Sequence, residues 1–105
     1  MIRVTVIYRW EDGARFDHDY YHSKHMDIAR EALSAHGLMR LESDRFFTRS
    51  SPSAGETIAA ANAYFATRET AQAALAAAGP ALMADLPNYS NLKPQVLLSA
   101  VTTHV

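Results

Sequence analysis

The chain has 105 residues, of which 49% are hydrophobic and 20% charged, and its formal net charge is -1 with histidine neutral. This size fits one domain with a single core, so we expect one domain over residues 1–105. A charge so close to neutral gives no attraction to nucleic acid or to an anionic membrane, and no apolar run approaches the roughly 18 residues that span a bilayer. Cysteine is absent, which excludes disulfides and thiolate metal sites, and a cytoplasmic protein is expected.

The first elements are a strand and a long helix. Residues 2–9 alternate and are rich in β-branched side chains, which predicts a strand. After a turn signal, residues 17–36 have the apolar spacing of an amphipathic helix. Asp17 is the expected N-cap, because its carboxylate can accept hydrogen bonds from free backbone N–H groups, and Phe16 before it can pack on the first turn. Gly37 is the expected C-cap.

Two strands and a loop follow. Residues 38–48 alternate but are polar, which predicts an edge strand or a partly solvated one. Residues 49–56 have the composition of a surface loop. For residues 57–66 we predict a strand, although three consecutive alanines favour a helix locally, because Ile58 and Tyr64 flank them and a helix follows at once.

The last part of the chain is predicted as helix, turn, loop and strand. A second helix should run over residues 68–78, with six alanines that allow a close approach to a sheet, and end at Gly79-Pro80. One further helical turn is expected over residues 81–85, then a loop over 86–91. Residues 94–101 close the chain as a fourth strand.

The order βαββαβ predicts an α+β ferredoxin-like sandwich, an antiparallel four-stranded sheet with two helices on one face. Right-handed crossovers leave the other face bare. That face should be apolar, because Ile7 lies opposite Val6 and Tyr8, and Val96-Leu97-Leu98 has no alternation. We therefore expect a second copy to cover it, in a twofold homodimer through the sheet face.

Residues 16–26 hold the densest group of side chains that can move protons. On the helix, Tyr21, His25 and Ile28 share one stripe, which should turn the imidazole toward the sheet. Near pH 7 a histidine can act as general acid or base, and Tyr21 one turn earlier is a natural hydrogen-bond partner. The alternative is a core histidine that bonds to a backbone carbonyl.

The three histidines of this stretch have the spacing of metal ligands. His18, His22 and His25 lie four and three residues apart, which could place three nitrogens on one helix face. No acidic residue or fourth histidine completes a site, however, so we expect no metal. Phosphate-binding glycine loops, nucleophile elbows and CxxC pairs are also missing.

A second cluster of candidate residues lies near the end of the chain. Asp85 ends an apolar helical turn, and a proline fixes the loop after it, so its carboxylate could be held near the sheet together with Tyr89. The alternative is that Asp85 only caps the loop by accepting N–H bonds. Gln95 starts the last strand and could project into the space between helices and sheet.

Two motifs together resemble the EthD family over essentially the whole chain. The first reads Asp12-Gly13-Ala14-Arg15-Phe16-Asp17-x-x-Tyr20-Tyr21-x-x-x-His25-Met26, and the second Met83-Ala84-Asp85-Leu86-Pro87-Asn88-Tyr89-x-Asn91-x-x-Pro94-Gln95. The resemblance implies a dimeric α+β barrel. The family is named for a protein needed in ethyl tert-butyl ether degradation, and relatives in the wider superfamily include cofactor-free monooxygenases, isomerases and polyketide cyclases.

We therefore expect an apolar pocket between helices and sheet that takes a small hydrophobic or aromatic molecule. If the protein is an enzyme, the expected reaction is cofactor-free acid/base chemistry, with His25 as acid or base and Tyr21 as its partner or an oxyanion donor. The expected substrate-binding residues are Tyr20, Asp85, Tyr89 and Gln95. The alternatives are a non-catalytic accessory protein that carries an intermediate for a partner oxygenase and, third, a haem-binding protein.

Overall fold

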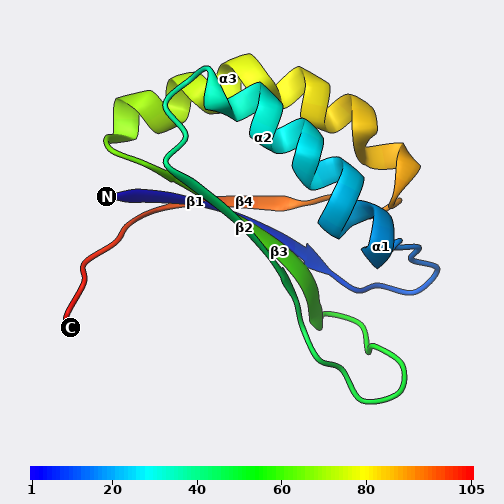
Figure 1. The fold of residues 1–105 in the computed structure, drawn as a ribbon. Helices are drawn as coiled ribbons and strands as arrows, with labels where there is room; N and C mark the ends of the chain where they lie inside the picture. Colours follow the sequence, from blue (N-terminus) through cyan, green and yellow to red (C-terminus); the bar gives the residue numbers. More distant parts are fainter.

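The computed structural model describes residues 1–105, which form one antiparallel sheet with the helices over one of its faces (Figure 1). The elements are β1 (Ile2–Arg9), α1 (His18–Tyr20), the π-helical turn η1 (Tyr21–His25), α2 (Met26–Ser34), β2 (Arg40–Arg45), β3 (Thr57–Phe65), α3 (Arg68–Asp85), the 3-10 turn η2 (Leu86–Asn88) and β4 (Gln95–Ala100). The strand order is β2-β3-β1-β4. This confirms the predicted ferredoxin-like α+β fold.

The first helical segment runs without a break through α1, η1 and α2, close to the predicted range. Asp17 caps it as expected, since its side chain accepts a hydrogen bond from the Tyr20 backbone N–H at 3.1 Å. The Phe16 ring packs on Tyr21 with 5.1 Å between ring centroids. Gly37 has a φ of +89°, a left-handed conformation that glycine adopts without strain, and turns the chain toward β2. The π-helical turn was not predicted.

Helix α3 is longer than its sequence suggests. The prediction that Gly79-Pro80 ends it is wrong, because α3 continues through both residues to Asp85. Pro80 is exposed and removes only one backbone hydrogen bond there. Packing on the opposite face of α3 keeps the helix intact at the proline. The residues of that face are Ala71, Ala74, Ala78, Leu82 and Asp85.

The core lies between α2, α3 and the inner face of the sheet. Val4 and Phe65 from the strands pack with Leu33 of α2 and Ala74 of α3. The predicted strand over 57–66 is confirmed as β3. Its alanines Ala59, Ala61 and Ala63 are buried on the inner face, where small side chains allow close packing. Strands β2 and β4 are shorter than predicted, with ordered pairing only over Arg40–Arg45 and Gln95–Ala100.

The outer face of the sheet is polar rather than apolar, so the prediction of continuous apolar strands is wrong there. Thr5 donates to the Asn62 side chain at 3.2 Å, and Asn62 in turn donates to Asp44 at 2.8 Å. On the same face, the Tyr64 hydroxyl donates to Glu42 at 3.1 Å. Polar side chains on the outer positions of β2 and β3 therefore bond to one another across the strands.

The edge strand β4 explains the missing alternation. Val96 and Leu98 pair with Val6 and Val4 and so face the helices, whereas Leu97 pairs with Thr5 on the outer face. All six residues of β4 are exposed because the helices do not reach this edge. A run of apolar residues here reflects an open edge rather than burial on both faces.

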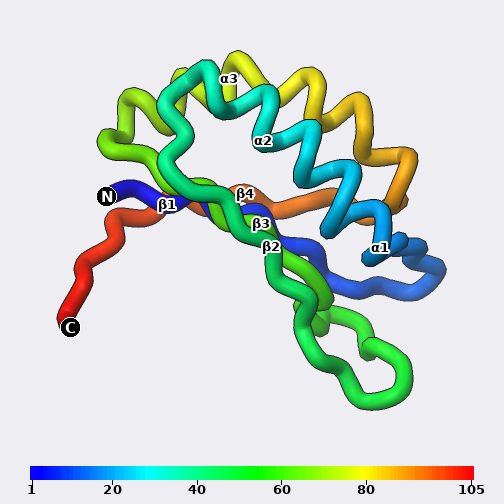
Figure 2. Tube along the Cα trace, viewed as in Figure 1, coloured from blue at the N-terminus to red at the C-terminus, as the bar shows by residue number.

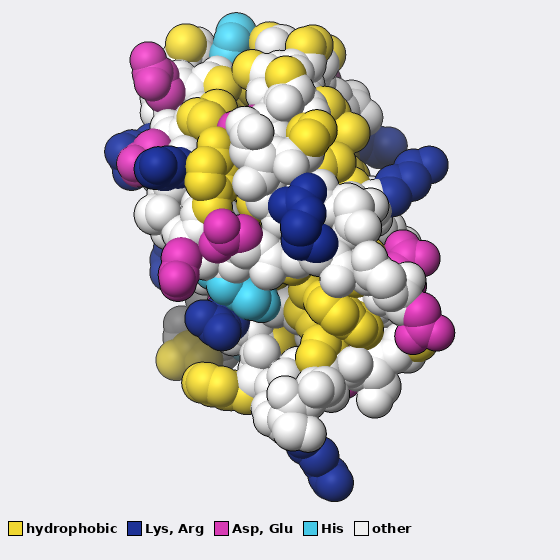
Figure 3. Space-filling model, turned by 90° about the vertical axis from the view of Figure 1, so that its right-hand side faces the viewer, with side chains coloured by type: hydrophobic (Ala, Val, Ile, Leu, Met, Phe, Trp, Pro, Cys, Tyr) yellow, Lys and Arg dark blue, Asp and Glu magenta, His cyan; other side chains and the backbone are white.

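The remaining surface is mixed in charge. Figure 3, which views the end of the molecule at α1, shows charged side chains of both signs between patches of hydrophobic ones. Residues 101–105 leave the sheet and run away from the body of the molecule (Figure 2). None of the helices combines the length and the apolar character that crossing a membrane requires. The expected cytoplasmic location stays a prediction.

Candidate functional site

A cavity of about 270 Å³ lies between the helices and the inner face of the sheet. One end of it is aromatic and is lined by His25 with Tyr8, Tyr21 and Tyr89. The rest of the lining is apolar, and no aspartate, glutamate, lysine or arginine side chain lines it. All the hydrogen-bonding side chains of the cavity are therefore concentrated near one histidine.

The π-helical turn η1 presents two of these residues to the cavity. Tyr21 and His25 are the buried residues of the turn, at 1% and 5% exposure. Their rings stack with 5.3 Å between centroids and an interplanar angle of 17°. Residues four apart share a helix face, and the wider π turn gives both rings room on that face. Stacking of this kind fixes the plane of the imidazole.

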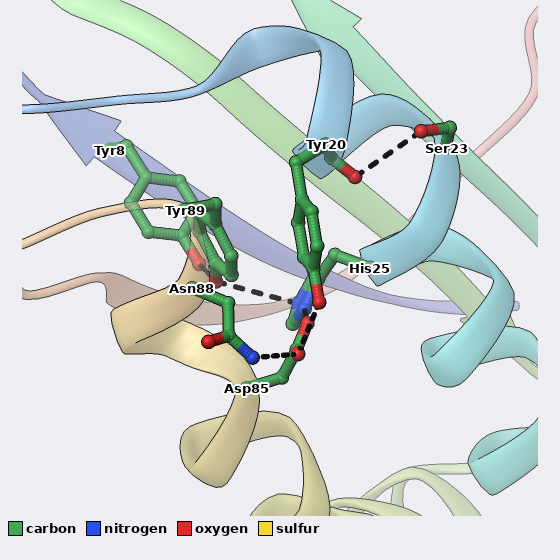
Figure 4. A network of polar contacts seen from close by, with 7 residues as sticks. All are labelled: Tyr8, Tyr20, Ser23, His25, Asp85, Asn88 and Tyr89. Carbon is green, nitrogen blue, oxygen red and sulfur yellow. Dashed lines mark hydrogen bonds and ion pairs between the residues drawn. The ribbon is translucent and has the colours of Figure 1, made fainter.

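Asp85, at the end of α3, bonds to the Nδ1 side of His25 (Figure 4). Its carboxylate accepts hydrogen bonds from the Tyr20 hydroxyl at 2.7 Å, the Asn88 amide at 2.9 Å and His25 Nδ1 at 2.8 Å. Burial raises the pKa of this carboxyl, but the hydrogen bonds outweigh burial, and the net pKa lies below its ordinary value. Asp85 is therefore a carboxylate at neutral pH.

This carboxylate decides which ring nitrogen of His25 carries the proton. An ionised carboxylate only accepts, so Nδ1–H must donate to Asp85 Oδ2, and Nε2 of the neutral ring is left with its lone pair. Nε2 lies 3.4 Å from the Tyr89 hydroxyl, a long contact for a hydrogen bond (Figure 4). The structure thus places a histidine ring, oriented by a buried carboxylate, at the wall of the cavity.

The tyrosine hydroxyls next to His25 remain protonated. The hydroxyls of Tyr8 and Tyr89 are 2.6 Å apart. Burial, and to a smaller extent the neighbouring Tyr8 hydroxyl, raises the pKa of both Tyr21 and Tyr89 well above its ordinary value. These hydroxyls can therefore donate hydrogen bonds at neutral pH, but they do not act as phenolate bases.

Backbone contacts between two loops hold Tyr89 in place. The loop before α1 and the loop after η2 pair at an isolated bridge between Phe16 and Ser90. The Asp17 N–H donates to the Tyr89 carbonyl at 2.8 Å. The Asn91 side chain accepts from the Arg15 N–H at 2.8 Å. The two sequence motifs are thus held together by hydrogen bonds, and these bonds fix the position of Tyr89.

The predicted site residues have different positions. His25, Tyr21 and Tyr89 line the cavity, whereas Asp85 and Tyr20 stand behind His25. The expected hydrogen bond between Tyr21 and His25 is not made, because His25 Nδ1 bonds to Asp85 and Tyr21 contacts the ring by stacking.

The prediction that Gln95 projects into the space between helices and sheet is wrong. Gln95 pairs with Ile7 and is exposed on the outer side of the sheet. Because side chains alternate along a strand, its neighbours Pro94 and Val96 line the cavity instead.

Two residues of the site were not singled out in the sequence. Tyr8 lines the cavity and bonds to Tyr89, and alternation along the first strand already put it on the inner face. Asn88 stands in the second motif, where only backbone N–H groups were expected to bond to Asp85, but its side-chain amide makes the bond. The spacing of three residues between Asp85 and Asn88 fits this contact, yet many loop pairs share that spacing.

The other two histidines form a separate pair. His18 Nδ1 lies 3.2 Å from His22 Nε2 with the rings parallel, and His22 Nδ1 lies 2.8 Å from the Ser43 hydroxyl. His25 bonds to Asp85 instead, so the three histidines do not converge. No group of three or more histidine, aspartate or glutamate side chains that could hold a metal ion is present. Burial lowers the pKa of both His18 and His22.

Solved structures with the same fold include EthD-like proteins, whereas the sequence matches no family model and no curated protein. An EthD-like protein from Ralstonia eutropha is 26% identical at a TM-score of 0.82, over 99% of this chain and 94% of that one. An ethyl tert-butyl ether degradation (EthD) family protein from Bacillus halodurans is 15% identical at 0.66, over 97% and 99%. A dimeric ferredoxin-like protein of unknown function from Bacteroides fragilis is 10% identical at 0.58, over 95% of both chains. The chain therefore has the fold of EthD-like proteins, the family that its two motifs resemble.

Proposed function

We propose that this protein binds a small hydrophobic organic molecule in the cavity and moves a proton of that molecule with His25. The observation that carries this proposal is the buried His25–Asp85 pair, at 2.8 Å, in which His25 Nε2 makes only a long contact of 3.4 Å with the Tyr89 hydroxyl and adjoins an otherwise apolar cavity. A histidine that only filled a core would have both nitrogens engaged and no cavity beside it. Here Asp85 orients the ring, as the carboxylate does in other acid/base pairs.

The reaction that suits these groups best is proton abstraction next to a carbonyl. Nε2 of His25 would take the proton from carbon, and Asp85 would stabilise the imidazolium that forms. The Tyr89 hydroxyl would donate a hydrogen bond to the oxygen on which charge develops, with the Tyr8 hydroxyl beside it. Isomerisation and dehydration begin with such a deprotonation at carbon, whereas oxygenation of an activated phenol begins with removal of the O–H proton by the same base. None of these roles in the first step requires a cofactor.

The size of the cavity limits the ligand. Ligand pockets commonly measure about 300–1,000 Å³, and this one, at about 270 Å³, lies at the small end. It suits a molecule of one or two rings and does not fit a haem macrocycle. The haem-binding alternative therefore has no site in this cavity.

A carbon-acid exchange assay tests the proposal. Benzylacetone (4-phenyl-2-butanone) in D₂O exchanges the protons next to its carbonyl, and proton NMR follows the loss of signal. We expect the protein to accelerate this exchange above buffer and His25→Gln to lower the rate about a hundredfold to ten-thousandfold. Tyr64→Phe, which removes a hydroxyl on the outer face of the sheet, is the matched control and should keep the wild-type rate. Exchange no faster than buffer would leave a binding or carrier protein, and an accelerated rate that is unchanged in His25→Gln would refute the role of His25.

We further propose a homodimer through the outer sheet face. The Bacteroides fragilis structure with this fold is described as dimeric. On the outer face, Arg3 has a buried Nε without a partner, and Arg40 lies near Glu42, so opposite charges are available to a second copy. Leu97→Arg should convert the dimer to a monomer in analytical ultracentrifugation, whereas Val96→Arg, one residue along on the opposite face, should not. A monomeric wild type, or a dimer in Leu97→Arg, would refute this interface.

A further inference from the structure

We infer that the cavity selects neutral apolar molecules that carry one hydroxyl or carbonyl oxygen at one end, and that it rejects carboxylates. This inference rests on the proposed function only in taking the cavity as the ligand site. It adds a substrate class, which follows from how polar groups and charges are distributed around the cavity. The argument has three parts: the polar end, the missing cation and the apolar length.

The polar end offers one place for one oxygen. His25 Nε2 and the Tyr89 hydroxyl are 3.4 Å apart, so the contact between them is weak and a ligand oxygen can replace it. A phenol or enol would donate its proton to Nε2 and accept from Tyr89, which satisfies both protein groups. A carbonyl oxygen would accept from Tyr89. The Tyr8 hydroxyl, 2.6 Å from that of Tyr89, supports the donor.

The cavity has no permanent cation that could pair with an anion. No lysine or arginine lines it, and the carboxylate of Asp85 lies 2.8 Å from Nδ1 of His25. A ligand carboxylate would lose its hydration and lie close to another carboxylate. Burying an unpaired charge is far more costly than burying a hydroxyl that finds a partner. Carboxylates should therefore bind poorly even where their apolar part fits.

The apolar end sets the length of the ligand. From the tyrosines the cavity extends past Leu75 and Leu82 to Met83 and Val96, whose side chains are 55% and 53% exposed. These exposed side chains form the mouth. An apolar cavity of about 150 Å³ is known to hold benzene. At about 270 Å³, this cavity has room for one ring with a short alkyl chain directed at the mouth.

Three probes of matched shape test the inference. 4-Butylphenol, butylbenzene and 4-butylbenzoate share one apolar body and differ at one end, and NMR titration of the protein at pH 7.5 gives their dissociation constants. We expect 4-butylphenol to bind best, butylbenzene about tenfold more weakly, since it lacks the hydrogen bonds, and 4-butylbenzoate about a hundredfold more weakly. If 4-butylbenzoate binds as tightly as 4-butylphenol, the inference is wrong.

Two variants locate the selection in the cavity. Tyr89→Phe should bring 4-butylphenol and butylbenzene to similar affinities, whereas Tyr64→Phe on the outer face should keep the wild-type ratio. Val96→Trp, at an exposed position, should obstruct the mouth and weaken all three probes without unfolding the protein. Wild-type affinity for every probe in Val96→Trp would place their binding elsewhere and overturn the inference, even if Tyr89→Phe did not fold.

The two proposals fail separately. If the wild type prefers 4-butylphenol but does not accelerate benzylacetone exchange, the acid/base function is refuted and the ligand class stands. If it accelerates exchange but does not discriminate between the probes, the ligand class is refuted and the acid/base function stands.

Discussion

Replacing Asp85 by asparagine should move the proton of His25 from one ring nitrogen to the other. Oδ1 of Asp85 already accepts from Tyr20 and Asn88, so the asparagine will keep its carbonyl oxygen on that side. Its amide will then face His25 Nδ1, where the carboxylate oxygen now lies at 2.8 Å. Two donors cannot face each other, so Nδ1 should become the acceptor and the proton should move to Nε2. The base would be lost from the cavity wall.

The size of the effect follows from the three hydrogen bonds. A bond to a charged group contributes about 1.5–3 kcal/mol and a neutral one about 0.5–1.5. Each of the three bonds to Asp85 should therefore weaken by about 1 kcal/mol. Because the variant no longer buries a charge, part of this loss is offset. We expect the free energy of unfolding to fall by about 1–2 kcal/mol, and the exchange rate of benzylacetone to fall at least about a hundredfold, as it does when the tautomer is wrong in Ser-His-Asp triads.

Two measurements check this prediction. Long-range ¹H–¹⁵N NMR correlation reports which nitrogen of His25 carries the proton, and urea unfolding at fixed protein concentration reports stability. Ser23→Ala, an exposed change on the same helical segment, serves as the control. A variant that kept Nδ1 protonated with an unchanged exchange rate would refute the role assigned to Asp85.

The same carboxylate predicts how stability depends on pH. The folded pKa of Asp85 lies below its ordinary value of 3.8, so its contribution to stability is complete above about pH 4. This contribution is lost as the pH falls from there through the folded pKa, because the unfolded chain takes up the proton first. The difference in unfolding free energy between the wild type and Asp85→Asn should therefore shrink in acid. A difference that stayed constant from pH 7 to pH 2 would mean that Asp85 is not stabilised as a carboxylate.

Three further changes test the fold. Ala74→Leu, at a fully buried position of α3, should lower the urea midpoint, with a loss of about 1–3 kcal/mol from overpacking, and an unchanged midpoint would mean loose packing. Gly37→Ala should cost about 1–3 kcal/mol by thermal unfolding, because φ is +89° and a Cβ would lie 2.8 Å from Thr70 Cγ2. Pro80→Ala should raise the melting temperature, with a gain of about 1 kcal/mol or more, because it restores the bond to the Ala76 carbonyl.

Periodicity predicted most of the fold because the core imposes it. Alternation placed Val4 and Tyr8 on the inner face, and the flanking Ile58 and Tyr64 outweighed the helical preference of the alanines between them. The error at Pro80 has a physical reason, since a helix tolerates one missing hydrogen bond when its other face is buried. The polar outer face was misjudged because an exposed edge strand and a doubly buried strand both lack alternation.

The candidate site was only half accessible to sequence reasoning. Tyr21 and His25 share a helix, so their spacing predicted that both face inward. Asp85, the partner of His25, is 60 residues away along the chain. No local sequence pattern predicts that the end of α3 lies beside the π-helical turn. The family motifs named Asp85 and Tyr89 without their roles, and the distances supply the contacts on which a role can be based.

Gly79 is a position at which the volume of the cavity can change. It lines the cavity from an ordinary helical conformation, and no atom outside its own stretch of helix backbone lies within 4 Å of the position that a Cβ would take. Alanine could therefore replace it without strain and would favour the helix by roughly 0.5–1 kcal/mol. Each added carbon would take space from the ligand while leaving His25 and its partners in place. Relatives could thus diverge in ligand size through a single codon, and the same position is a starting point for redesign.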